Sequence, residues 1–144
     1  MSTSTLAVLG AGTLGHAIAH VSAYAGHSVR PFVLEDSPVS AGLVKIAAHP
    51  DMRVARGNTD PDRAAAALPR ITGTSSLAEA VRGADLVIEA VPEKLEIKRS
   101  LFAQVAEHAS SDVIYGTNTS SLSIASIAEG LEDSSRVIGL HFFN

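Results

Sequence analysis

The chain has 144 residues, of which 46% are hydrophobic and 18% charged, and its formal net charge is −4. This composition predicts one folded domain, excludes a disordered chain, and argues against a broad nucleic-acid-binding surface. The sequence contains no cysteine, which excludes disulfides and zinc–thiolate sites and fits a cytoplasmic protein. No apolar run reaches the length of about 18 residues that a membrane span requires, so no membrane association is expected.

The first predicted element is a β-strand over residues 6–9, which runs directly into a glycine-rich turn. The turn, Gly10-Ala-Gly-Thr-Leu-Gly15, has the pattern G-x-G-x-x-G, and an amphipathic helix follows it and ends near Gly26. The first glycine permits a tight turn, the second lets backbone N–H groups approach a pyrophosphate, and the third allows close helix packing. The helix dipole contributes a further ~0.3–1 kcal/mol toward a bound phosphate. The segment therefore predicts a dinucleotide-binding turn.

The rest of the chain alternates between strand and helix patterns. We expect strands at residues 28–34, 70–72, 85–90, 113–115 and 137–140, helices at residues 37–47, 64–68, 76–81 and 94–108 and from Ser121 or Ser123 onward, and a polar loop at residues 49–63. Pro31 conflicts with its strand because proline donates no ladder hydrogen bond, and a strand that starts near Phe32 would remove the conflict. Ile97, Leu101 and Val105 mark the expected buried face of the helix over residues 94–108. This alternation predicts an α/β fold, a doubly wound parallel sheet with helices on both faces.

Polar residues follow most of the predicted strands. In a doubly wound sheet the ligand lies outside the carboxyl ends of the strands, so these residues should line one cleft. The clusters are residues 10–15, 35–36, 90–93, 116–121 and 141–144. His16 and His20 have a spacing that is compatible with metal binding, but no carboxylate or thiol is near them in the sequence. We therefore expect no metal site.

Four segments resemble the L-3-hydroxyacyl-CoA dehydrogenase family. They are GAGTLGHAIA at 10–19, DLVIEAVPEKLEIKRSLF at 85–102, TNTSSLSI at 117–124 and RVIGLHFFN at 136–144. The resemblance implies that residues 1–144 form a Rossmann-type NAD-binding domain, with a small-molecule 3-hydroxyacyl-CoA substrate and a role in fatty acid β-oxidation. The C-terminal substrate and dimerisation domain of the family is not in this sequence, and a homodimer is implied only where that domain is present.

The resemblance also implies roles for individual residues. His141 would be the general base, which takes the proton of the substrate 3-hydroxyl while hydride leaves C3 for the nicotinamide; the ordinary pKa of histidine, about 6.5, suits this step. Ser120 would contact the substrate oxygen and the cofactor, and its alternative role is a helix N-cap. The implied cofactor contacts are Gly10, Gly12, Thr13, Leu14, Gly15, Glu93, Lys98, Ser120 and Asn144. Without the resemblance, Glu93 and Lys98 would be interpreted as an exposed ion pair of little energetic value.

The acidic group for the adenosine ribose is either Glu35 or Asp36. Arg30-Pro31-Phe32 resembles a three-residue insertion that brings Asp36 into register, so we favour Asp36, with Glu35 as the alternative. A carboxylate here, with no arginine immediately after the strand, favours NAD over NADP.

Two departures from the family leave alternatives open. Met52 and Asn58 stand where the family has a serine and a lysine for the CoA moiety. This difference favours a related enzyme for a small hydroxy acid. The family also has, beyond the HFFN motif, the glutamate that pairs with the catalytic histidine. We therefore expect the 144-residue chain to have little activity alone and Asn144 not to be the natural end, and a non-catalytic NAD-binding module is the third alternative.

Overall fold

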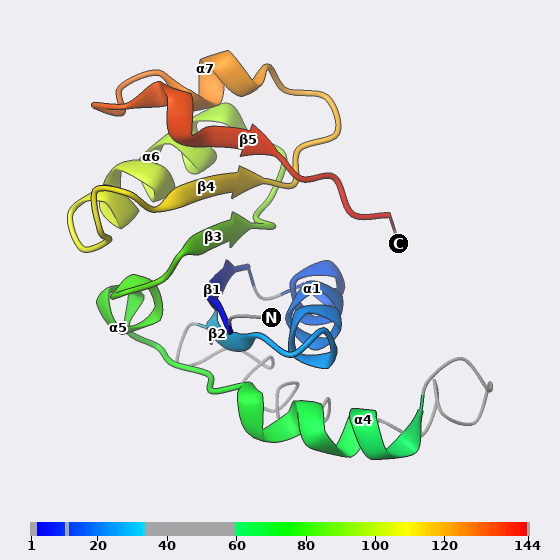
Figure 1. Ribbon diagram of the computed structural model, residues 1–144. Coiled ribbons are helices and arrows are strands. Elements are labelled where there is room, and N and C mark those ends of the chain that lie inside the picture. The colour runs from blue at the N-terminus through cyan, green and yellow to red at the C-terminus, as the bar shows by residue number, and fades with distance from the viewer. Residues whose placement is uncertain (1–2, 11, 34–59, 144) are drawn as a thin grey trace.

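The computed structural model describes residues 3–10, 12–33 and 60–143, and a parallel β-sheet forms its centre (Figure 1). The strands are β1 (Thr5–Leu9), β2 (Ser28–Phe32), β3 (Leu86–Glu89), β4 (Ile114–Thr117) and β5 (Val137–Gly139). Their order in the sheet is β2-β1-β3-β4-β5, and every pairing is parallel. The predicted doubly wound, Rossmann-type α/β fold is confirmed.

Helices cover both faces of the sheet. They are α1 (Thr13–Tyr24), α4 (Pro61–Ala67), α5 (Leu77–Val81), α6 (Leu95–Ala106) and α7 (Ile124–Ala128), with short 3-10 helices at Leu68–Arg70 and Ser134–Arg136. In Figure 1, α1 and α4 lie on one side of the sheet, and α5, α6 and α7 lie on the other. Each side has its own apolar core, one around Val8 and Ile18 and the other around Val87 and Phe102. None of the helices in the described ranges is long and apolar enough to cross a bilayer.

Local hydrogen bonds explain where the helices begin and end. Gly26, just past α1, has a φ of +102°, which only glycine adopts readily. The Ser123 hydroxyl accepts a hydrogen bond from the Ser126 N–H, which identifies Ser123 rather than Ser121 as the N-cap of α7. Asp60 caps α4, and Pro61 is its first residue. The expected loop over residues 49–63 therefore ends earlier than predicted, whereas the expected helix over residues 37–47 lies outside the described residues.

The strand expected at residues 28–34 is found as β2, and because β2 runs through Pro31, the alternative start near Phe32 is wrong. The Pro31 carbonyl accepts the Thr74 N–H at 3.0 Å, and the Val33 N–H donates to the Thr74 carbonyl at 3.0 Å. In a parallel strand the N–H and C=O of one residue point to the same side, so the nitrogen of Pro31 faces the outer edge of β2. There the expected strand at residues 70–72 is reduced to an isolated bridge at Ile71, and a second isolated bridge follows at Thr74. A missing donor is tolerated at such an edge.

The buried face of α6 also differs from the prediction. Lys98, Phe102 and Val105 are the buried residues of this helix, whereas Ile97 is 40% exposed. The helix is thus rotated relative to the expected stripe: Val105 is buried as predicted, Leu101 is partly buried against the core, and Ile97 faces outward. A lysine at a core position requires a buried partner for its charge, and the neighbouring strand supplies one.

The orientation of α6 can be tested with two truncations on the same helix. Phe102→Ala should lower the free energy of unfolding by about 3–5 kcal/mol, because it removes a fully buried ring that packs edge-on against Tyr115. Ile97→Ala should change it by no more than about 0.5 kcal/mol. Urea denaturation of the two variants measures both effects, and a larger loss for Ile97→Ala would contradict the packing described here.

Candidate functional site

The glycine turn between β1 and α1 is held by close backbone contacts. Gly10 has a φ of +136°, and a Cβ added there would lie 2.5 Å from the Ala90 carbonyl oxygen at the end of β3. A Cβ on Gly15 would lie 2.2 Å from the Gly10 carbonyl oxygen. Neither glycine can therefore accept a side chain without movement of the backbone. The sequence predicted a tight turn at Gly10 and close packing at Gly15, and both are found.

Gly12 has a different environment from the other two glycines of the motif. A Cβ on Gly12 would meet no atom within 4 Å, so the space beside it is open. Gly12 is also the N-cap of α1, with no side-chain cap, and the first turn of this helix carries no acidic residue. Among the described residues, the N–H groups at Thr13 and Leu14 therefore have no side-chain acceptor, and the positive end of the helix dipole faces the opening. These features fit a bound pyrophosphate.

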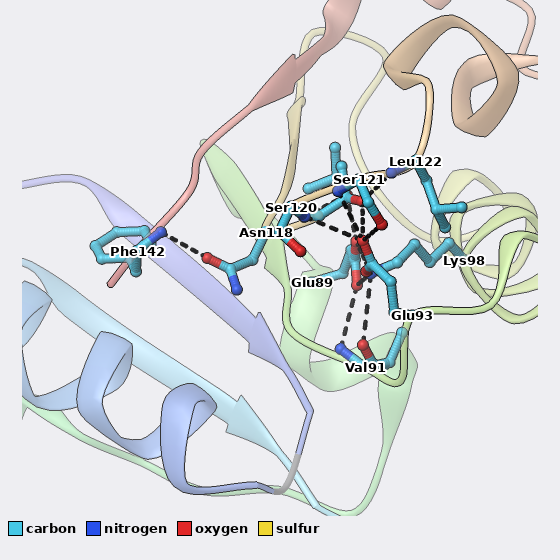
Figure 2. Close-up of polar contacts among 11 residues, drawn as sticks. Glu89, Val91, Glu93, Lys98, Asn118, Ser120, Ser121, Leu122 and Phe142 are labelled. Atoms are coloured by element: carbon cyan, nitrogen blue, oxygen red, sulfur yellow. Dashed lines mark hydrogen bonds and ion pairs between the residues drawn. The ribbon is translucent and has the colours of Figure 1, made fainter. Parts of the chain in front are cut away.

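A buried polar cluster lies where β3 and β4 end. Glu89 and Thr117 are register partners on these strands, and both side chains are buried. The Lys98 ammonium donates to both Glu89 carboxylate oxygens, at 2.7 and 2.9 Å, and the Thr117 hydroxyl donates to one of them. Figure 2 shows Lys98 directed at Glu89 and Glu93. The side chain of Lys98 is only 1% exposed, so the interpretation of Lys98 as part of an exposed ion pair is wrong.

Glu93 organises the turn that carries Ser120 (Figure 2). One of its carboxylate oxygens accepts the Ser120 N–H at 3.0 Å and the Ser121 N–H at 3.2 Å, and it also accepts the Thr119 hydroxyl. Its other oxygen lies 3.2 Å from Lys98 Nζ. Partial burial raises the pKa of Glu93, but the hydrogen bonds of the turn and of Lys98 outweigh this effect and lower it from 4.5 to about 2. Glu93 is therefore an ionised acceptor at neutral pH.

The strand end that carries His141 is fixed to the same loop. The Leu140 N–H donates to the Thr117 carbonyl at 2.8 Å, and the Phe142 N–H donates to the Asn118 side-chain oxygen at 2.7 Å. His141 lies between these two anchored residues, with an exposed ring whose centroid is 4.6 Å from that of Phe143. The structure thus brings the segment after β5, residues 140–142, to the end of β4 and the loop that follows it, as the sequence predicted for the carboxyl ends of parallel strands.

Several predicted site residues lie outside the described part of the chain. They are Glu35, Asp36, Met52, Asn58 and Asn144. The proposed ribose contact and the contact of Asn144 with the cofactor therefore stay predictions.

The sequence analysis missed three residues that position segments of the site through hydrogen bonds. Glu89, Asn118 and Thr119 had no assigned role, although each makes a hydrogen bond that positions a site segment. One signal was available for the charged pair. Glu89 ends an apolar strand, and Lys98 precedes Phe102 and Val105 at helical spacing, so both charges occupy positions that periodicity assigns to the core. No comparable signal marks Asn118 or Thr119, because turn residues are usually polar.

Comparison with known families agrees with this geometry. Residues 5–144 match the model of the family described as 3-hydroxyacyl-CoA dehydrogenase, NAD binding domain. The chain belongs to this family. The matched region includes every described strand of the sheet and the glycine turn at residues 10–15. NAD is the cofactor that the family description names, and the predicted cofactor is confirmed at this level.

The similar proteins are longer than this chain. It is 40% identical over 144 residues to a 3-hydroxyadipyl-CoA dehydrogenase of Escherichia coli K12, and it covers 30% of that protein. A crystal structure of 3-hydroxybutyryl-CoA dehydrogenase from Escherichia coli K12 is 39% identical, with a TM-score of 0.89. The match includes 100% of this chain and 30% of that structure. A solved diketoreductase that acts on dicarbonyl compounds is 34% identical, with a TM-score of 0.84, and the chain covers 52% of it.

The two glycines at the helix end allow binding and folding to be tested separately. Gly12→Ala should weaken NADH binding at least about ten-fold, because its methyl group fills the open space that the phosphates approach. It should change the free energy of unfolding by less than about 1 kcal/mol. Gly15→Ala should instead destabilise the fold by about 1–3 kcal/mol, because its Cβ meets the Gly10 carbonyl.

Calorimetric titration with NADH and urea denaturation measure the two properties for each variant. Unchanged NADH affinity in Gly12→Ala would contradict the placement of the phosphates at this turn.

Proposed function

We propose that the protein is an NAD-dependent 3-hydroxyacyl-CoA dehydrogenase that acts in fatty acid β-oxidation. The observation that carries this proposal is the hydrogen bond from the Phe142 N–H to Asn118, which joins the segment of His141 to the loop of Ser120. The glycine turn lies at the same edge of the sheet, because Gly10 packs against Ala90 after β3. A general base, a hydroxyl group and a dinucleotide turn are thus presented along one edge.

Each of these groups has a distinct task in the proposed reaction. NAD, when bound, accepts the hydride that leaves C3 of the substrate. His141 takes the proton of the 3-hydroxyl group, and the exposed ring is accessible for this role. The Ser120 hydroxyl makes no hydrogen bond within the described residues and is therefore available to hold the substrate oxygen. Glu93, Lys98 and Asn144 are carried over from the family as cofactor contacts.

The proposal extends to the rest of the protein and to its location. We assign substrate binding and homodimer formation to a helical C-terminal domain. This assignment agrees with the greater length of the relatives, because the chain covers only 30% of each. The absence of cysteine supports a cytoplasmic location.

A second candidate is a dehydrogenase or reductase for a small hydroxy acid or carbonyl compound. Two observations favour it. Met52 and Asn58 replace the family's CoA-binding serine and lysine, and the 34% identical diketoreductase acts on dicarbonyl compounds. The same cofactor domain thus serves substrates of both kinds among its relatives.

The preference for NAD over NADP can be tested at Asp36. Asp36→Ala should weaken NADH binding about 10- to 150-fold, because a charge-assisted hydrogen bond to the ribose contributes about 1.5–3 kcal/mol. Binding of NADPH should weaken far less or improve. Calorimetric titration of both cofactors measures the effect, and Glu35→Ala, titrated in the same way, tests the alternative residue. Equal affinity of the unsubstituted protein for the two cofactors would rule out this preference.

The chemistry is tested on the longest product of the reading frame with NAD and either 3-hydroxybutyryl-CoA or free 3-hydroxybutyrate. We expect the CoA thioester to be oxidised with the higher kcat/KM, and His141→Gln to lower kcat by about 10²–10⁴-fold. His108→Gln, an exposed histidine beyond α6, is the control and should leave kcat unchanged.

A higher kcat/KM for the free acid would establish the second candidate, and no turnover of either compound would establish a non-catalytic module. The 144-residue chain alone should have little activity, because a covering domain positions substrate and excludes water. Turnover by this chain within tenfold of the longer product would contradict that expectation.

A further inference from the structure

The Lys98 ammonium is fully occupied by oxygen atoms of the protein. It lies 2.7 and 2.9 Å from the two Glu89 oxygens, 3.2 Å from a Glu93 oxygen and 3.4 Å from the Val91 carbonyl. A lysine has three N–H donors, and here four acceptors surround them. Because the side chain is also 1% exposed, the ammonium has neither a free donor nor an opening through which a ligand could reach it.

Glu89 fixes the place of this ammonium. It is fully buried, and besides Lys98 it accepts hydrogen bonds from the Thr117 hydroxyl and from the Val91 N–H at 3.2 Å. These donors come from β4 and from the β3–α6 connection. The carboxylate therefore cannot move without breaking contacts to both neighbouring segments, and it holds the Lys98 ammonium at one point behind the site.

Glu93 connects this buried pair to the Ser120 turn. Its side chain is 35% exposed, one oxygen faces Lys98, and the other receives the donors of the turn. The Thr119 hydroxyl donates to Glu93 and accepts the Leu122 N–H at 3.0 Å, so that the turn over residues 119–122 closes around a single carboxylate oxygen. The orientation of Ser120 thus depends on where Glu93 is held.

We propose that Lys98 is a positioning residue, which is anchored by Glu89, aligns the Glu93 carboxylate, and so shapes the turn that presents the Ser120 hydroxyl, without binding the cofactor through its own ammonium. This inference rests on the proposed function for the meaning of Ser120. It revises the role that the family resemblance gives to Lys98, and it leaves Glu93 with an exposed edge for the cofactor ribose.

The first test is a titration of the turn, followed by the backbone amide signals of Ser120 and Ser121 in NMR spectra. From about pH 6 to about pH 3, the range in which an ordinary glutamate titrates, these signals should barely move in the unsubstituted protein, because the pKa of Glu93 is about 2. Lys98→Met removes one of the hydrogen bonds that lower this pKa, so a titration step should appear within the range. Lys94→Met, an exposed lysine one turn earlier, is the control.

The second test is a double-mutant cycle on the dissociation constant of NADH, with Lys98→Met, Glu93→Gln and the combined variant. If Lys98 acts through Glu93, the combined variant should bind NADH within about two-fold of Glu93→Gln alone. If the ammonium binds the cofactor directly, the two losses multiply. If the losses of NADH affinity in the two single variants multiply in the combined variant, the proposal is overturned, regardless of the result of the amide titration. The absence of a new titration step in Lys98→Met also overturns it.

Lys98→Met leaves the Glu89 carboxylate buried without a counter-charge and could prevent folding. Glu89→Gln/Lys98→Met then replaces it in both tests, because this pair removes both buried charges and keeps an acceptor for Thr117. If the unsubstituted protein fails to bind NADH at all, the proposed function fails, and the amide titration alone decides on Lys98.

Discussion

The arrangement of the whole site depends on one buried ion pair. Glu89 at the end of β3 and Lys98 on α6 are both removed from water, and such a pair is stable only when its remaining hydrogen-bonding groups are satisfied. Thr117 and Val91 meet that requirement, and Glu93 extends the pair toward the surface. A well-packed apolar pair could hold the helix against the sheet equally well, but it could not orient a carboxylate at the rim. The main contribution of the ion pair is therefore to orient the Glu93 carboxylate, rather than to hold α6 against the sheet.

The parallel sheet brings the remaining groups together. Because the strands run in the same direction, the glycine turn, the Glu93 connection, the Ser120 turn and the His141 segment leave the sheet along one edge. Backbone contacts and the side chains of Glu93 and Asn118 together set their positions relative to one another. Gly10 touches the Ala90 carbonyl, the Ala90 N–H donates to Leu9 at 2.7 Å, and Leu140 bonds to Thr117. Contacts that hold these segments in place before a ligand arrives lower the entropic cost of binding.

The sequence predicted the fold class, the glycine turn and the edge that carries the polar loops, because hydrophobic periodicity and glycine spacing are local signals. It failed where the answer depends on a distant neighbour. Pro31 fits its strand only because β2 faces isolated bridges at its outer edge, and no local pattern reveals that. The rotation of α6 was mispredicted because Lys98 was assigned to the surface, whereas its partner Glu89 lies on another element. The role of Asn118 is likewise set by a backbone group 24 residues away.

The pairing of β1 with β3 has a consequence for how the domain folds. Leu6 and Leu86 are register partners, and the Thr5 N–H donates to an Asp85 side-chain oxygen, so the centre of the sheet joins residues that are 80 apart in the sequence. Contacts of such separation slow folding, since the entropy of closure is lost before the contact is gained. The glycine turn packs on Ala90, the residue after β3, so its final shape depends on this long-range pairing. A dinucleotide that recognises the finished turn acts on the folded chain alone, and its concentration raises the stability of the entire domain rather than that of one loop.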